Sequence, residues 1–334
     1  MVGEMPMRIA AVMSMGAGAL FAAAAFAADA PRTLWGDPDL RGTYASDNSI
    51  GVPFERPAQF GERAQLTDEE YAARVNANDQ QIAKDKNPSP ESEFSAEDPA
   101  AINASRHWLE RPETPSHATS MVVDPPNGRL PALTPAGQQQ QAERRAARTR
   151  GLPASYKDFT NYDRCLTRGA TGSILPVIYG NGTQIVQAPG YVVIRNEMIH
   201  EARVIPLDHS QRPGPNVRLW LGVSRGHFEG DTLVIETTNF TDRTGLGGNG
   251  NGPGHSDQLT LTERLKRIDA KSLRYEFTVD DAATYAQPWS VAFNLDQKQG
   301  YEIYEYACHE GNYGLANMLS AARAEERAKP KAKR

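Results

Sequence analysis

Three ionisable residues share one alternating set of positions in segment 255–265. His255, Asp257 and Glu263 alternate in step with leucines, whereas the intervening positions carry polar or basic residues. Because successive side chains of a strand point to opposite faces, the pattern predicts that all three groups face a core. Buried ionisable groups need partners or a use, so we predict a functional site at this strand.

Three further ionisable residues are expected near the same interior. His200 alternates with apolar residues of its own segment and is therefore predicted to point inward. His309 and Glu310 follow the last predicted strand, at a rim from which side chains can reach the end of a barrel. These three residues complete a candidate cluster around the first strand.

Proton transfer is the chemistry that this cluster predicts first. A neutral histidine beside a carboxylate can move protons near neutral pH, and His255 and Asp257 would lie roughly 7 Å apart along a strand. Glu263 would lie roughly 20 Å further on, so it joins such a site only if the sheet curves strongly. Three histidines and a carboxylate also match a zinc or iron site, although the sequence has no His-x-His or His-x-x-x-His pair.

The predicted function is that of an exported enzyme performing cofactor-free general acid/base chemistry on a small organic molecule held in a β-barrel. A lyase, an isomerase and a hydrolase all fit this description. Two alternatives remain open: a non-catalytic periplasmic binding protein for an apolar ligand, and a zinc- or iron-dependent enzyme. A purely apolar carrier has no need for inward-facing charges, and this favours the enzyme.

The elements that must position these residues are short strands. Segments of period two, rich in Val, Ile, Tyr and Thr, are separated by Gly, Pro and Asn, and few helical stretches intervene. We expect a mainly β domain at 156–315, an antiparallel meander that closes into a lipocalin-like barrel or a strongly curved sheet. The predicted strands are 183–187, 191–195, 198–205, 217–223, 232–238, 258–268, 272–279, 289–295 and 301–307.

The segment before this domain, residues 28–155, has the composition of an extended arm. It contains 14 of the 23 prolines, which regular sheets and long helices do not tolerate. Two helices are expected in it, one beginning at the capping box of Thr67 and Glu70, the other capped by Thr134 with Pro135 in first position. A final helix over about 313–329 should pack against the barrel, and the C-terminal segment 316–334 ends in a basic tail.

The start of the chain predicts export. Arg8 precedes an alanine-rich apolar run, and Ala25 and Ala27 form the small-x-small pattern of a signal peptidase site, so residues 1–27 are interpreted as a signal peptide. The alternative is an uncleaved membrane anchor. We expect a periplasmic or secreted protein with no membrane attachment once the signal is removed. The net charge of −5 argues against nucleic acid as a partner and leaves a small molecule.

Cys165 and Cys308 are the two cysteines of the chain. In an oxidising compartment such a pair favours a disulfide, which would stabilise the fold by roughly 5 kcal/mol on the chain-entropy model. Two reduced, buried thiols are the alternative.

Two short motifs imitate known sites without their structural context. Ser224 lies in a Gly-x-Ser-x-Gly pattern, but a strand rather than a helix is expected to follow it. Residues 245–250 match Gly-x-Gly-x-x-Gly and lack the helix that would hold phosphates. We interpret the first as a connection between strands and the second as a loop.

Five segments, in this order along nearly the whole chain, resemble those of a large group of exported bacterial proteins of unassigned function. Tyr44 and Phe228 stand where that group is expected to have tryptophan. The resemblance implies export and one shared fold, and it assigns no catalytic residue. The segments are PDLRGTY (38–44), FERP (54–57), VDPPNGR (123–129), SRGHFEGDTLV (224–234) and YACHEGNY (306–313).

Overall fold

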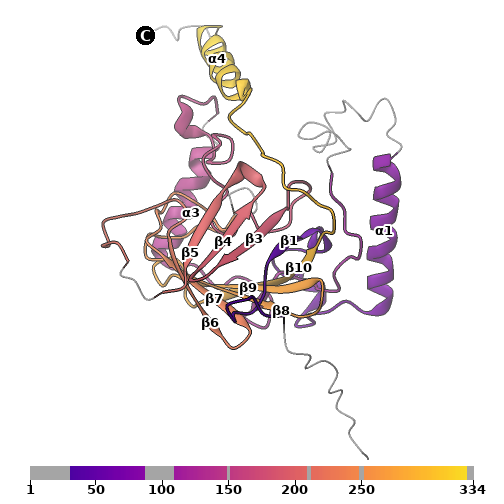
Figure 1. The fold of residues 1–334 in the computed structure, drawn as a ribbon. Coiled ribbons are helices and arrows are strands. Elements are labelled where there is room, and N and C mark those ends of the chain that lie inside the picture. Colours follow the sequence, from indigo (N-terminus) through magenta and orange to yellow (C-terminus); the bar gives the residue numbers. More distant parts are fainter. Residues whose placement is uncertain (1–30, 87–108, 149–150, 209–211, 248–251, 329–334) are drawn as a thin grey trace, which may run out of the picture.

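One antiparallel sheet forms the body of the molecule in a computed structural model that describes residues 31–86, 109–148, 151–208, 212–247 and 252–328 (Figure 1). The predicted signal, residues 1–27, and residues 329–334 of the basic tail lie outside these ranges.

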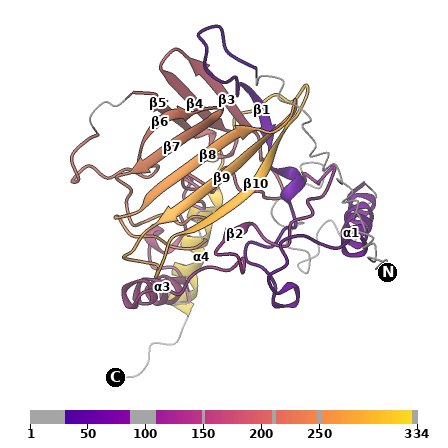
Figure 2. The same cartoon turned by 90° about the horizontal axis from the view of Figure 1, so that it is seen from below.

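Among the residues that the structure describes, the sheet has ten strands, nine of them in the continuous order β5-β4-β3-β1-β10-β9-β8-β7-β6, with β2 beside β10. The outermost strands, β5 and β6, lie against each other, so the sheet curls into a nearly closed barrel (Figure 2). The strands are β1 (Gly42–Ala45), β2 (Val122–Asp124), β3 (Thr183–Ala188), β4 (Tyr191–Asn196), β5 (Ala202–Pro206), β6 (Val223–Glu229), β7 (Thr232–Thr238), β8 (Thr260–Arg267), β9 (Ser272–Asp280) and β10 (Trp289–Gln297).

Six predicted strands are confirmed, as β3, β4, β7, β8, β9 and β10. The prediction for 198–205 is half right, because β5 begins only at Ala202. The predictions for 217–223 and 301–307 are wrong: β6 begins at Val223, and segment 301–307 has no strand. Alternation alone does not make a strand; a neighbouring backbone must also take up its hydrogen bonds.

The proline-rich arm contributes two strands that the sequence did not predict. β1 lies between β3 and β10, with Tyr44 opposite Thr183 on one side and Gln297 on the other. β2 pairs with β10. The barrel is therefore not a simple meander, because a strand of the arm joins its two halves.

The interior of the barrel is filled with side chains. Trp289 is fully buried, and three aromatic rings meet it edge to face, those of Phe54 at 6.0 Å, Phe277 at 6.1 Å and Tyr285 at 5.5 Å between ring centroids. Such pairs contribute about 0.5–1.5 kcal/mol each beyond their buried area. Since Phe54 comes from the arm, this cluster fixes the arm to the sheet.

The three predicted helices are present as α1 (Asp68–Lys86), α3 (Pro135–Arg148) and α4 (Tyr313–Ala328). The Thr67 hydroxyl accepts from Glu70 N, and the Glu70 carboxylate accepts from Thr67 N, which confirms the capping box. Thr134 Oγ1 caps α3 by accepting from Gly137 N at 3.1 Å. The 3-10 turns are η1 (Asp47–Ser49), η2 (Ala58–Phe60), η4 (Tyr156–Asp158) and η5 (Met198–His200).

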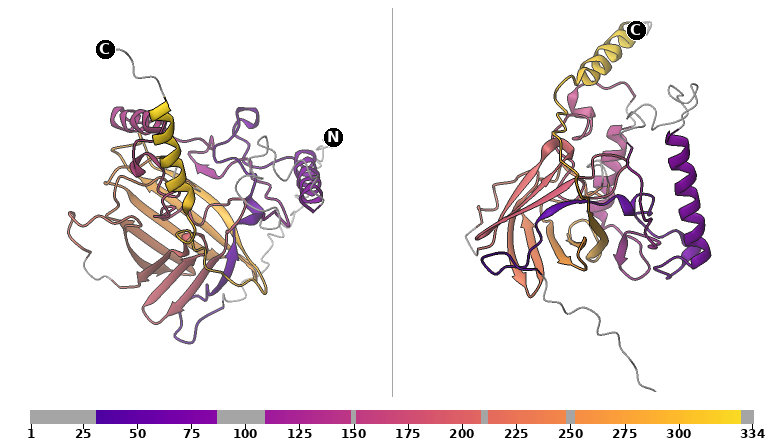
Figure 3. Two further views of the ribbon diagram at one scale, coloured as in Figure 1. Left: turned by 90° about the horizontal axis from the view of Figure 1, so that it is seen from above. Right: turned by 45° about the vertical axis from the view of Figure 1, so that its right-hand side comes forward.

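The expected packing of the last helix on the barrel is wrong. α4 projects away from the sheet, and α1, a part of the arm, stands to one side of the sheet (Figure 3). The Arg323 guanidinium of α4 donates to Pro153 O and Ala154 O, each at 2.8 Å, in the segment that follows α3. Within the described ranges, none of the helices is both long and apolar enough to cross a membrane.

Cys165 and Cys308 form a disulfide, as predicted. The bond joins the loop before β3 to the strand-free segment that leads into α4. It therefore holds that segment beside the end of the barrel.

Candidate functional site

A cavity of about 960 Å³ lies where β3 begins and β4 ends, and we call it the end cavity. Its other wall is the strand-free segment 301–312, which the disulfide holds in place. Two smaller cavities have volumes of about 460 and 520 Å³. The end cavity is lined by Leu109, Glu110, Tyr162, Asp163, Tyr179, Gly180, Glu197, Lys298, Tyr301, Tyr304, Glu305, Tyr306, Ala307, Cys308, Glu310, Gly311 and Asn312.

Glu110 lines this cavity and forms a pair of carboxyl groups with Asp47, which lies behind the lining. The Asn181 amide nitrogen donates to Asp47 Oδ1 at 2.9 Å and to Glu110 Oε2 at 2.7 Å, so one side chain holds both groups together. Burial, and then the negative charge of Asp47, raise the pKa of Glu110 to about 7. Lys298 forms an ion pair with Asp47. Glu110, with its raised pKa, titrates near neutral pH.

A tyrosine and a third carboxylate extend this network. The Tyr301 hydroxyl lies 2.5 Å from Glu197 Oε2 and 3.4 Å from Glu110 Oε1. Because a hydroxyl has one proton to donate, it donates to Glu197 in the shorter contact. Burial raises the pKa of Glu197 and that of Tyr301 above their ordinary values. The three groups thus form a continuous chain through which protons can redistribute.

Gly182 makes room for this contact. A Cβ added at Gly182 would lie 2.6 Å from Glu197 Oε2 and 2.8 Å from the Tyr301 ring, distances that no side chain tolerates without displacement. Position 182 therefore favours glycine, because a larger residue would collide with Glu197 and Tyr301. The site depends on backbone and side chains approaching closely at this point.

Three tyrosines that line the cavity lie close together, one of them beside a buried arginine. The Tyr162 hydroxyl lies 3.1 Å from that of Tyr179 and 3.4 Å from that of Tyr306. The Arg168 guanidinium lies 5.6 Å from the Tyr162 ring centroid, and burial lowers the pKa of this arginine to about 10. Burial also raises the pKa of Tyr162 and of Tyr179, so the phenols stay neutral.

The backbone around the cavity is locally strained. Cys165, Ile199 and His200 have φ of 54°, 56° and 43°, in the left-handed region that bulky and β-branched residues avoid. Strain of this kind costs on the order of 1–3 kcal/mol per residue and clusters at functional sites. All three belong to segments that border the cavity.

His255 lies elsewhere and has both ring nitrogens engaged. Its Nδ1 donates to Ser256 O at 2.9 Å, which leaves Nε2 to accept from the Thr244 hydroxyl at 2.7 Å. The residue is 1% exposed, and burial lowers its pKa, so the ring is neutral. The structure thus gives His255 a packing role in a loop, with Phe240 against its ring at 5.6 Å.

Asp257 does not share a face with His255. β8 begins only at Thr260, so the alternation that predicted a common face does not apply to residues 255–259. The Asp257 side chain is 50% exposed and pairs with Arg218 at 3.3 Å. The predicted His255–Asp257 pair is therefore wrong in its geometry.

Glu263 is inward, as predicted, and fully buried. Its carboxylate accepts from both terminal nitrogens of Arg203, at 2.5 and 2.7 Å, and from the Tyr275 hydroxyl at 2.7 Å. We call these three residues the barrel triad. Glu263 and Arg203 thus form a structural ion pair in a packed core, and neither residue lines the end cavity.

His200 is exposed, contrary to the prediction that it points inward. The left-handed pair Ile199 and His200 breaks the strand before β5 and shifts its alternation by one residue, so Arg203 faces the interior and Val204, at 60% exposure, faces outward. The His200 Nδ1 lies 3.2 Å from Tyr306 O in a wall of the end cavity.

His309 and Glu310 lie at the rim, as expected, and both are exposed. Glu310 lines the end cavity. The structure thus brings His200, His309 and Glu310 near one cavity and leaves His255, Asp257 and Glu263 away from it.

Ser224 lies within β6, and its hydroxyl is 2.8 Å from the Thr237 hydroxyl of β7. The predicted connection between strands is therefore wrong at this residue, although a strand and not a helix follows the motif, as predicted. Of the glycine-rich loop, residues 248–250 lie outside the described ranges.

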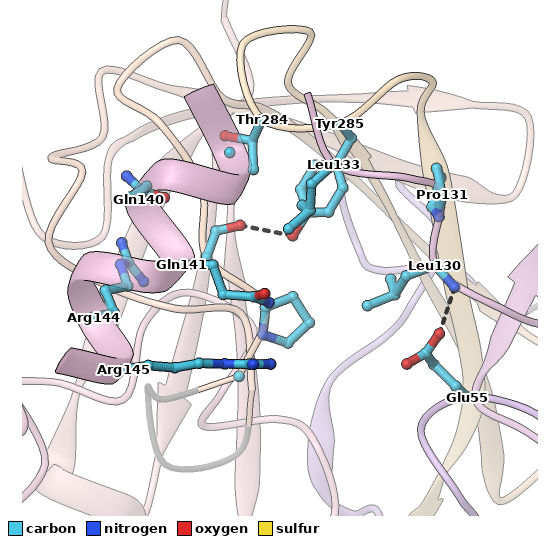
Figure 4. Close-up of a pocket in the computed structure, with 14 residues that line it drawn as sticks. Glu55, Leu130, Pro131, Leu133, Gln140, Gln141, Arg144, Arg145, Thr284 and Tyr285 are labelled. Carbon is cyan, nitrogen blue, oxygen red and sulfur yellow. Dashed lines mark hydrogen bonds between the residues drawn. The ribbon is translucent and has the colours of Figure 1, made fainter. Parts of the chain in front are cut away.

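A second cavity lies between α3 and the loops around Gly254 and Tyr285 (Figure 4). Gln141 and Arg145 reach into it from the helix, and the Tyr285 hydroxyl donates to Gly254 O at 2.7 Å. Arg144 is already bound to two backbone carbonyls, at 3.0 and 2.7 Å. Because Arg144 and Tyr285 already make hydrogen bonds to the surrounding backbone, this cavity is a weaker candidate for the functional site than the end cavity.

Among the side chains that the structure describes, no group of three or more His, Cys, Asp or Glu is arranged to hold a metal ion. Comparisons of the chain with protein-family models, curated proteins and solved structures find no match.

Sequence reasoning missed Asp47, Glu110, Glu197 and Tyr301 altogether. The first two lie in the proline-rich arm, outside any periodic segment, and Glu197 precedes a kink. One signal was available: segment 301–306 concentrates three tyrosines and two glutamates without forming a strand. A polar, aromatic segment that does not pair with a sheet is a candidate binding wall.

Proposed function

We propose that the protein is an exported enzyme of the lyase, isomerase or hydrolase class, which moves protons on a small organic molecule bound in the end cavity. The observation that carries this proposal is the contact network of Glu110, Tyr301 and Glu197 within a cavity large enough for such a molecule. A carboxyl group with a pKa of about 7 can donate or accept a proton at physiological pH.

The two carboxyl groups suit different roles. Glu110 keeps its proton for part of the time at neutral pH and would act as the acid, whereas Glu197 accepts a hydrogen bond from Tyr301 and would act as the base. Tyr301 bridges them, so the proton can return after each turnover. Removing one such group commonly costs 10²–10⁴-fold in rate.

Export and the finer identity of the fold belong to the same proposal. The signal-like segment 1–27 and the Cys165–Cys308 disulfide support an oxidising compartment such as the periplasm. The antiparallel, nearly closed barrel supports a lipocalin-like scaffold, and the five quoted segments support the resemblance to exported bacterial proteins. A carrier of apolar ligands is less well supported, because carboxylates and hydroxyl groups line the cavity.

Activity can be tested without knowing the substrate. Purified protein is incubated with fractionated bacterial small-molecule extracts, and the change in each metabolite is measured by mass spectrometry. We expect the wild type to deplete one compound and to form an isomer, an elimination product or a hydrolysis product, with Glu110→Gln and Glu197→Gln slower by about 10²-fold or more. Glu143→Gln, which removes an exposed carboxylate of α3, is the matched control.

Two results would reject the proposal. One is a wild-type protein that changes no compound in any fraction. The other is turnover that survives unchanged in both cavity variants.

A further inference from the structure

The end cavity carries an unusual combination of charge and aromatic surface. Five of its lining residues are acids and one, Lys298, is a base. Lys298 is already paired with Asp47 behind the wall, so it does not offset the acids that face the cavity. The acids are Glu110, Asp163, Glu197, Glu305 and Glu310.

Five tyrosines line the same cavity. The face of an aromatic ring carries negative charge density and attracts cations within about 6 Å of its centroid. The chain's own cations already use this attraction here: the Lys298 ammonium lies 5.5 Å from the Tyr301 centroid and the Arg168 guanidinium 5.6 Å from that of Tyr162. The remaining tyrosines are Tyr179, Tyr304 and Tyr306.

We propose that the end cavity selects a small organic cation, a protonated amine or a quaternary ammonium compound, as the substrate of the proposed enzyme. This inference rests on the proposed function in taking the end cavity as the substrate site. The acids supply long-range attraction, and the tyrosine faces supply a surface that suits a bulky, weakly hydrated cation. An anionic ligand would meet uncompensated carboxylates.

The arrangement places selection and chemistry in successive parts of one cavity. Tyr304 is 71% exposed, and Glu305 and Glu310 lie with it at the rim, where a cation first arrives. Glu197 and Glu110 are less exposed than these two acids. A bound cation would therefore meet the proton-transfer groups only after passing the acidic rim.

Binding of matched probes tests the charge requirement directly. Isothermal titration calorimetry at pH 8 and low salt compares choline with its uncharged isostere 3,3-dimethylbutan-1-ol, and benzylamine with benzyl alcohol. We expect the cation of each pair to bind at least tenfold more tightly, with a preference that shrinks as salt is added. Equal affinity within both pairs, including an absence of measurable binding, would overturn the inference.

Variants assign the preference to this cavity. Glu197→Gln keeps the shape of the side chain and should weaken choline binding about tenfold, while the isostere is unaffected; Glu143→Gln on α3 should change neither. Tyr304→Leu should weaken choline several-fold, whereas Tyr191→Leu, a change of an exposed tyrosine on β4, should not. Tyr304 and Tyr191 are both exposed, so neither leucine substitution disturbs the core.

The proposed enzyme and the proposed ligand can fail separately. Selective binding of cations without turnover of any compound would reject the enzyme and keep the ligand class. Turnover of an uncharged compound, lost in Glu110→Gln, would keep the enzyme and reject the cation.

Discussion

Substitution of Glu110 by glutamine should remove a pH-dependent weakness of the fold. In the unfolded chain a glutamic acid titrates near its ordinary pKa of 4.5, whereas in the folded protein the pKa of Glu110 is about 7. Below pH 4.5 both states hold the proton and the group contributes nothing. Between these two values the folded state keeps a proton that the unfolded state has lost, so stability falls as the pH rises.

The size of this effect follows from the shift. Each pKa unit corresponds to about 1.4 kcal/mol, so a rise from 4.5 to about 7 predicts that ionisation of Glu110 lowers the free energy of unfolding by about 3 kcal/mol above pH 7. Glutamine keeps an oxygen that can accept from Asn181 and carries no charge to repel Asp47.

The assay is urea unfolding of the wild type and Glu110→Gln at several pH values from 4 to 8.5. The difference in stability between the two proteins should grow in favour of the variant across pH 4.5–7 and then stay constant. A difference that is flat over this range, or one that grows toward low pH, would refute the burial and repulsion assigned to Glu110. Glu143→Gln, which changes an exposed carboxylate of α3, is measured beside it as the control.

Three other predictions concern groups outside the carboxyl network. Glu263→Gln should lower the free energy of unfolding by about 3–5 kcal/mol, because it leaves Arg203 buried without its anion. In urea unfolding, the double variant with Arg203→Met should recover part of this loss, and strictly additive losses would contradict the prediction. Cys308→Ser should lower the free energy of unfolding by roughly 5 kcal/mol, because the disulfide closes a segment of 143 residues. A variant as stable as the oxidised wild type would contradict this prediction. Burial lowers the pKa of His255, so below pH 6.5 the unfolded chain takes up a proton that the folded protein does not. His255→Gln should therefore lose less stability on acidification than the wild type. Identical curves of unfolding free energy against pH for the two proteins would contradict this prediction.

Periodicity predicted the sheet well where a strand is flanked by two others. In β8 the alternation of leucines correctly placed Glu263 in the interior, and β7 has the predicted bounds, 232–238. The capping box at Thr67 located the start of α1 because that signal is local to four residues. These features depend on neighbours in the chain, which a sequence displays directly.

The end cavity could not be found in this way, because long-range contacts assemble it. Asn181 and Asp47 are 134 residues apart in the chain, and Asn181 and Glu110 are 71 apart. None of the three lies in a strand, so no alternation marks which of them is inward. β1 was missed for a related reason: it has only four residues, and its place between β3 and β10 depends on both neighbours.

The kink at Ile199 and His200 explains why His200 was wrongly predicted to point inward, and it also borders the end cavity. The left-handed residues Ile199 and His200 end the alternation of β4 and restart it one residue out of step. The shift turns Arg203 inward, where it meets Glu263 and completes the barrel triad. The same kink lies just after Glu197, whose carboxylate faces Tyr301.

The molecule therefore contains two kinds of buried ionisable group, and their environments differ in a way that bears on function. In the barrel triad the Glu263 carboxylate accepts from the Arg203 guanidinium and the Tyr275 phenol in a packed core, so its charge is fixed. In the end cavity Glu110 lies beside a second carboxylate, shares one amide with it and borders open space, so it holds its proton up to a pKa of about 7 and can exchange it near neutral pH. Groups of the first kind stabilise a fold, whereas a titratable group that remains accessible to a ligand is what proton transfer requires.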